Sequence, residues 1–264
     1  MKSTASLFAD TSKYAADLDW IIHSPSLFID PIVLNVGNLN GIHFQPFISG
    51  SYGLSNRLGF YYQWLWKQVI EQSAHYDLIA EEVQINHEGR TIGAIDFILR
   101  EHATQQLEHW EIAVKFYLFY QGQWLGPNNS DRLDLKIDKM LNHQLTLTSS
   151  DAFIAQTCYT EAIKPKMLVQ GRLYTNPFLE ERLPSHCCGL ALNKKTITGQ
   201  WCFEHQYPLI NEPLYLLDKS QWMSGKPSLS EKPFEIGKIS RTVHLQSESG
   251  VFWFIVPNEW ININ

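Results

Sequence analysis

Three charged side chains, Asp96, Glu111 and Lys115, lie in stretches of sequence that otherwise have the composition of a buried sheet. A buried charge is costly unless it is paired with an opposite charge or holds a metal ion. Carboxylates supply the oxygen ligands that Mg²⁺ accepts, and a lysine beside them can neutralise negative charge that develops in a reaction. These residue types leave two alternatives, a metal-binding site and a structural ion pair.

The elements that must position these charges are two strands, expected at residues 90–100 and 108–119. Both stretches are rich in β-branched and aromatic residues, which are typical of strands. Strand side chains alternate between faces, so Asp96 shares a face with small and apolar residues, and Glu111 shares a face with Lys115. At ~3.3 Å per residue, the Cα atoms of Glu111 and Lys115 lie ~13 Å apart.

A helix and a third strand precede this pair. The run from Leu58 to Ser73 is apolar nearly all round, which predicts a buried helix, with Asn56 as its N-cap. Residues 77–86 form the next predicted strand, and the Gly-containing turn after it predicts a hairpin. The three strands should therefore form an antiparallel meander.

A second helix, near residues 131–146, and a strand at 166–174 complete the predicted core. Before the core, a helix is expected between Leu7 and Ile29, ending at Pro25, and the segment from Thr175 onward is rich in short extended runs. The sequence thus predicts an α+β fold with a central mixed sheet. We divide it into an N-terminal helical segment (1–56), a core (57–175) and a β-rich C-terminal part (176–264).

Composition limits the classes of function. The 264 residues are 44% hydrophobic and 18% charged, with a net charge of −6, which indicates a packed protein and disfavours a large basic surface. No apolar run is long enough to span a membrane, and the N-terminus lacks the apolar core of a signal peptide. We therefore expect no membrane partner, a cytoplasmic location, and four reduced cysteines.

Several segments resemble a bacterial family described only as domain of unknown function 1853. They are RTIGAIDFILR, HWEIAVKFYL, LGPNNSDRLDLKIDKMLNHQL, VQGRLY and FIVPNEW, and they match in order over essentially the whole chain. The family is grouped by remote similarity with the PD-(D/E)XK nuclease-like superfamily. The resemblance implies a helix, three strands, a helix and a strand, which is also the order predicted above.

The resemblance also implies roles for the three charges. Asp96 and Glu111 would hold Mg²⁺, for which Mn²⁺ can substitute, and Lys115 would act beside them in phosphodiester hydrolysis of nucleic acid. The sequence departs from the superfamily pattern, because the lysine should follow the acid by two residues, and here Ala113 lies between them. A related exonuclease group has an acid on the first helix, where this chain has Gln63, and a Gln on the second, which matches Gln144.

Two hypotheses of function follow. The first is a metal-dependent nuclease, and the second is a non-catalytic descendant of that fold that binds nucleic acid or a protein partner. If Lys115 belongs to a buried ion pair, its truncation should cost about 3–5 kcal/mol of stability.

Other clusters in the sequence are weaker candidates. The spacing of His186, Cys187, Cys188, Cys202 and His205 matches no familiar zinc site. The four tryptophans from 201 to 260 favour core packing over a platform for stacking bases. The acid and lysine in Asp134-Leu135-Lys136 would point to different sides of a helix.

Overall fold

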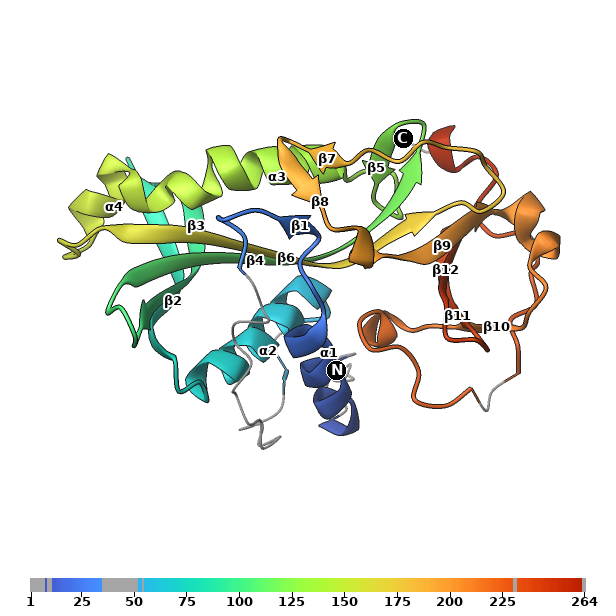
Figure 1. The fold of residues 1–264 in the computed structure, drawn as a ribbon, viewed down its shortest axis with the longest axis horizontal. Helices are drawn as coiled ribbons and strands as arrows, with labels where there is room; N and C mark the ends of the chain where they lie inside the picture. The colour runs from blue at the N-terminus through green and yellow to red at the C-terminus, as the bar shows by residue number, and fades with distance from the viewer. Residues whose placement is uncertain (1–7, 9–10, 35–51, 54, 230–231, 263–264) are drawn as a thin grey trace. The chain divides into compact units, whose positions relative to one another are not determined.

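The computed structural model describes Phe8 and residues 11–34, 52–53, 55–229 and 232–262. The protein is α+β, with a large mixed sheet and a few helices (Figure 1), as the sequence predicts. The chain divides into two compact units. Unit 1 contains Met1–Val114 and Ile137–Gln170, and unit 2 contains Lys115–Lys136 and Gly171–Asn264. The three-segment division made from the sequence stays a prediction.

The predicted meander is confirmed in unit 1. Its strands are β2 (Tyr76–His87), β3 (Arg90–Glu101) and β4 (Leu107–Tyr120), each antiparallel to the next. The β2–β3 turn contains Gly89 with φ 76°, a conformation that glycine adopts without strain. The strand β6 (Ile163–Thr175) follows β4 in the sheet order, and both β4 and β6 continue into unit 2.

The helices of unit 1 are shorter than the sequence suggests. The first is α1 (Tyr14–His23), preceded by the 3-10 turn η1 (Thr11–Lys13), and it ends at Ser24, whose backbone is extended before Pro25. The predicted stop at Ser24-Pro25 is confirmed, and the short strand β1 (Phe28–Ile29) follows it. The predicted buried helix is α2 (Leu58–Glu71), which begins after Arg57, so Asn56 is not its N-cap.

The predicted helix near 131–146 is interrupted. It consists of α3 (Leu133–Asn142) and the 3-10 helix η3 (Gln144–Ser149), and α4 (Asp151–Gln156) follows. The break is at His143, whose φ of −132° is not helical. The ring of His143 bonds instead to the carbonyl oxygen of Ile92 in β3, at 2.9 Å. This contact with the sheet explains the change in backbone direction.

Both faces of the unit 1 sheet are covered (Figure 1). On one face, Trp66 of α2 packs edge-on against Trp110 of β4. On the other face, Leu147 of η3 lies over Gly93 of β3, where an added Cβ would be 2.8 Å from its Cδ1 atom. Glu111 of β4 therefore lies within a sheet that is covered on both faces.

Unit 2 is rich in β-structure. Its sheet order is β10-β11-β12-β9-β6, with β5 paired to the end of β4. The strands are β5 (Gln123–Leu125), β9 (Ile197–Phe203), β10 (Leu214–Leu216), β11 (Val243–Ser247) and β12 (Phe252–Val256), with a hairpin of β7 (His186–Cys187) and β8 (Leu190–Leu192). Short 3-10 turns connect them: η4 (Lys194–Thr196), η5 (Glu204–Leu209), η6 (Lys219–Gln221) and η7 (Trp260–Asn262).

Three tryptophans of unit 2 are in its core. Trp201, Trp253 and Trp260 are all buried, which agrees with the packing role expected from their apolar flanks. Within the described ranges, no helix is long and apolar enough to cross a membrane.

Candidate functional site

Asp96 lies where β3 leaves its regular pairing with both neighbouring strands. The β3–β4 ladder reaches Phe97↔Trp110, one residue short of Asp96. On the β2 side, Glu82 lies across from Asp96, between the paired residues Glu81 and Val83. The backbone of Glu82 has a positive φ of 47°, which is irregular for a strand. The half-buried Asp96 bonds to β4 through its side chain, because its Oδ2 accepts from the backbone N–H of Ile112 at 2.9 Å.

Glu111, on β4, is hydrogen-bonded through both of its carboxylate oxygens. Its exposed fraction is 0%. Its Oε1 lies 2.8 Å from Nε2 of His109, which precedes it by two residues on the same face of the strand. Its Oε2 accepts a hydrogen bond of 2.7 Å from Nε2 of Gln144, the first residue of η3. We call His109, Glu111 and Gln144 the Glu111 centre.

The protonation of His109 follows from its burial. Burial lowers its pKa to about 4, and the nearby charge of Asp96 opposes this shift without reversing it. The carboxylate of Glu111 also favours the charged ring, yet a fully buried imidazole loses more by desolvation. The ring is therefore neutral at neutral pH, and the contact with Glu111 assigns its proton to Nε2, which donates.

Lys115 has a different partner, in unit 2. Its Nζ forms an ion pair with Oδ2 of Asp131 at 2.7 Å, and the hydroxyl of Tyr117 donates to the same oxygen at 3.1 Å. The side chains of Lys115 and Asp131 are 27% and 45% exposed. The backbone beneath is close-packed, because a Cβ at Gly171 (φ +143°) would lie 1.6 Å from the Lys115 carbonyl oxygen. We call Lys115, Tyr117 and Asp131 the Lys115 cluster.

The two predicted accessory glutamines have different environments. Gln144 bonds directly to Glu111, as described above. Gln63 instead lines a hollow of about 310 Å³ in unit 1, where its neighbours include Trp64, Lys67 and Glu82. Only one of the two glutamines therefore lies at the Glu111 centre.

The donor set can be compared with what Mg²⁺ requires. Asp96 and Glu111 are two carboxylates, and among the residues with described positions no group of three or more His, Cys, Asp or Glu side chains could hold a metal. Both oxygens of Glu111 already face N–H groups, which occupy the directions from which a cation would approach. This arrangement does not fit a resident Mg²⁺, and the catalytic and metal-binding roles remain predictions.

The sequence reasoning missed two residues that decide these environments. His109 was overlooked, although its spacing of two from Glu111 on a strand places both on one face. Asp131 was expected inside a helix, whereas it precedes α3 and lies against Lys115. No local pattern signals this second contact, since the two residues are 16 positions apart.

Comparison with known proteins gives a family and no activity. Residues 39–249 match the family model described as "Domain of unknown function (DUF1853)". No curated protein and no solved structure matches the chain. Because the match covers most of the sequence, the chain belongs to this family.

Proposed function

We propose that this DUF1853 protein is a non-catalytic binding module and not a metal-dependent nuclease. The observation that carries the proposal is the Glu111 centre. A catalytic carboxylate must exchange its contacts among metal, water and substrate, whereas Glu111 is fully buried with a hydrogen-bond donor on each oxygen. Opening the centre would strand His109 as a buried donor, at a cost of about 1–3 kcal/mol, and would remove the partner of the half-buried Gln144.

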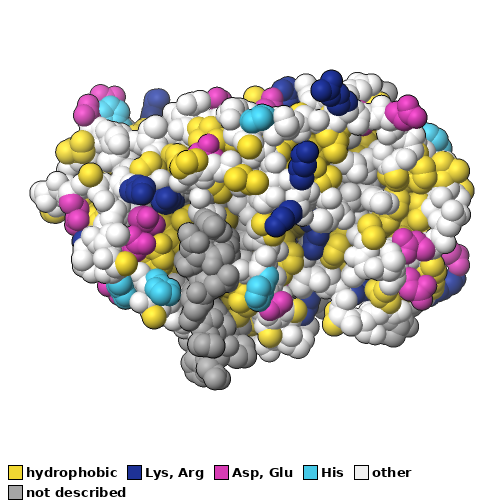
Figure 2. All heavy atoms as spheres, viewed as in Figure 1, with side chains coloured by type: hydrophobic (Ala, Val, Ile, Leu, Met, Phe, Trp, Pro, Cys, Tyr) yellow, Lys and Arg dark blue, Asp and Glu magenta, His cyan; other side chains and the backbone are white. Residues whose placement is uncertain are grey.

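The surface charge favours a protein partner over nucleic acid. On the face shown in Figure 2, Lys and Arg side chains are scattered among acidic and hydrophobic ones. A nucleic-acid interface usually gathers basic residues on one face or along one groove. The net charge of −6 opposes association with a polyanion further.

The test measures metal binding and hydrolysis in the same preparation. The purified chain is incubated with Mg²⁺ or Mn²⁺ and mixed single- and double-stranded DNA and RNA, while thermal unfolding is followed with and without metal. We expect no cleavage and no rise in Tm at millimolar metal, because both oxygens of Glu111, the residue predicted to bind metal together with Asp96, already accept hydrogen bonds. Metal-dependent cleavage by wild-type protein would contradict the proposal.

A metal-dependent nuclease is the second candidate, and the position of Asp96 favours it. Asp96 is only half-buried, and its carboxylate bonds to the amide next to Glu111. In this case Asp96→Asn and Glu111→Gln would each abolish cleavage while leaving the unfolding transition cooperative. The exposed Glu88→Gln is the matched control, and its activity should equal that of the wild type.

A further inference from the structure

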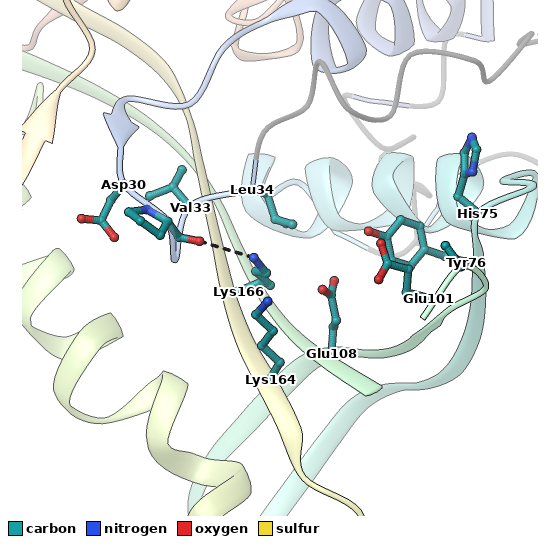
Figure 3. A pocket seen from close by; sticks show the side chains of 11 residues that line it. Asp30, Val33, Leu34, His75, Tyr76, Glu101, Glu108, Lys164 and Lys166 are labelled. Atoms are coloured by element: carbon teal, nitrogen blue, oxygen red, sulfur yellow. Dashed lines mark hydrogen bonds between the residues drawn. The ribbon is translucent and has the colours of Figure 1, made fainter. Parts of the chain in front are cut away.

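A cavity in unit 1 contains side chains of both charges and has no role in the Glu111 centre. Its volume is about 450 Å³, within the range of small-ligand sites, which is about 300–1,000 Å³. Five charged side chains line it: Asp30, Glu101, Glu108, Lys164 and Lys166. In Figure 3, Glu101, Glu108, Lys164 and Lys166 extend from β3, β4 and β6, while the carboxylate of Asp30, in the segment after β1, turns away from them.

Glu108 is the most constrained of these groups. It is 5% exposed, and its Oε2 accepts a hydrogen bond of 2.7 Å from Nε1 of Trp110. It points away from Glu111, because residues 108 and 111 lie on opposite faces of a strand. A carboxylate buried to this degree is costly unless an opposite charge approaches it. Glu108 therefore places a buried negative charge in the cavity wall, which a cationic ligand group would compensate.

Glu101 and Tyr76 extend the acidic side of the cavity. They are cross-strand partners on β3 and β2, and they lie together in Figure 3. Burial raises the pKa of Tyr76, and the charges of Glu108 and Glu101 raise it further. The phenol is therefore neutral, and a bound ammonium group would meet two carboxylates beside an uncharged aromatic ring.

Lys164 and Lys166 form the basic side. They are two residues apart on β6, so both extend from the same face of the strand. The Nζ of Lys166 is 3.4 Å from the carbonyl oxygen of Pro31, and within the described ranges neither lysine forms an ion pair with an acid of the cavity. Opposite charges thus face one cavity without neutralising each other directly.

The balance of charge selects the class of ligand. Two carboxylates, Glu101 and Glu108, share the cavity with Lys164 and Lys166, so a doubly charged phosphate would be repelled by the acids as well as attracted by the lysines. A molecule with an ammonium group and a carboxylate would be matched at both ends. We infer that this cavity binds a short zwitterionic peptide or amino acid, its amine at Glu101 and Glu108 and its carboxylate at Lys164 and Lys166. The inference goes beyond the proposed function and does not depend on the role of the Glu111 centre.

Calorimetric titration of the whole chain at pH 7 tests the inference. The probes are alanine, dialanine and trialanine, trialanine with an acetylated amine, trialanine with an amidated carboxylate, inorganic phosphate and a nucleoside monophosphate. We expect at least one free zwitterion to bind, and blocking either end to weaken binding by about tenfold or more. Equal binding of free and blocked peptides, or binding of phosphate or nucleotide alone, would overturn the inference, as would the absence of binding by every zwitterion.

Paired variants assign the two ends. The double variant Lys164→Ala, Lys166→Ala should lose the preference for a free carboxylate and keep the preference for a free amine. Glu108→Gln should do the reverse, and its amide oxygen can still accept from Trp110. The exposed Lys139→Ala and Glu88→Gln are matched controls, and thermal unfolding verifies that each variant folds. Variants that weaken binding while leaving both preferences intact would refute the assignment.

Discussion

The Glu111 centre of unit 1 and the Lys115 cluster of unit 2 are both built around a carboxylate, and they differ in their exposure to water. Each contains a carboxylate that faces two hydrogen-bond donors, and each includes residues of β4. Glu111 and His109 are almost completely excluded from water, with side chains 1% and 0% exposed. Lys115 and Asp131 are 27% and 45% exposed.

The difference in exposure determines how much each group contributes to stability. Water reaches Lys115 and Asp131, so their ion pair adds little net stability, whereas the side chain of Tyr117 is buried and its hydroxyl depends on Asp131. Glu111 and His109 are shielded from water, so the hydrogen bond between them depends on both partners, while Gln144 is half-buried. A charged residue on a strand is therefore informative only together with its burial, because the same contact has different energies in the two settings.

Replacing the central carboxylate tests the comparison most strongly. Glu111→Leu should lower the free energy of unfolding by about 2–4 kcal/mol, because it strands the buried donor of His109 at about 1–3 kcal/mol and the half-buried donor of Gln144 at about 1 kcal/mol. Asp131→Leu is the matched substitution at the Lys115 cluster, and it should lower the free energy by about 1–2 kcal/mol, because it strands one buried donor, the hydroxyl of Tyr117, while water solvates Lys115. Urea denaturation followed by tryptophan fluorescence measures both values. Equal losses would mean that burial does not distinguish the two groups.

Acidification should destabilise the Glu111 centre. The pKa of His109 is about 4 in the folded chain, against an ordinary value of 6.5 that applies once the chain unfolds and the ring is solvated. Between these pH values the unfolded chain binds a proton that the folded chain does not bind. The contribution of neutral His109 to the free energy of unfolding is therefore complete above pH 6.5 and is lost as the pH falls toward 4. The loss should be about 3 kcal/mol.

Comparison of variants isolates this contribution from that of other groups. His109→Gln keeps a donor for Glu111 and cannot titrate, so its stability should depend less steeply on pH between 6.5 and 4. The exposed His87→Gln should retain the wild-type slope. A His109→Gln slope identical to that of the wild type would show that the ring is protonated in the folded chain.

The smallest effect is expected at Lys115. Its partial exposure removes the basis for the loss of 3–5 kcal/mol that a buried pair would give, so Lys115→Ala should cost about 0–1 kcal/mol. High salt should reduce even this difference, because it screens exposed charges. Thermal unfolding at low and high ionic strength measures both effects. A loss above about 3 kcal/mol would place this cluster in the same class as the Glu111 centre.

Local periodicity determined much of unit 1. The alternation of β3 and β4 predicted both strands and the covered face that carries Glu111, since side-chain direction on a strand depends only on sequence spacing. The apolar run of α2 likewise predicted a buried helix, with an observed start at Leu58 as expected. Strand alternation and helix periodicity depend on residues that are close in sequence, so they can be recognised in a single sequence.

Tertiary structure decided the partners of those residues. Gln144 reaches Glu111 from 33 positions away, and Asp131 rather than an acid of unit 1 pairs with Lys115. The cavity charges come from strands distant in sequence, with Lys164 and Lys166 on β6 and Glu108 on β4. Periodicity states which face a side chain occupies and leaves open what is packed against that face. The bonding partner of a charged side chain and its exclusion from water determine whether it binds a ligand, stabilises the fold or is solvated. Both the partner and the exclusion of water arise only when distant segments pack together.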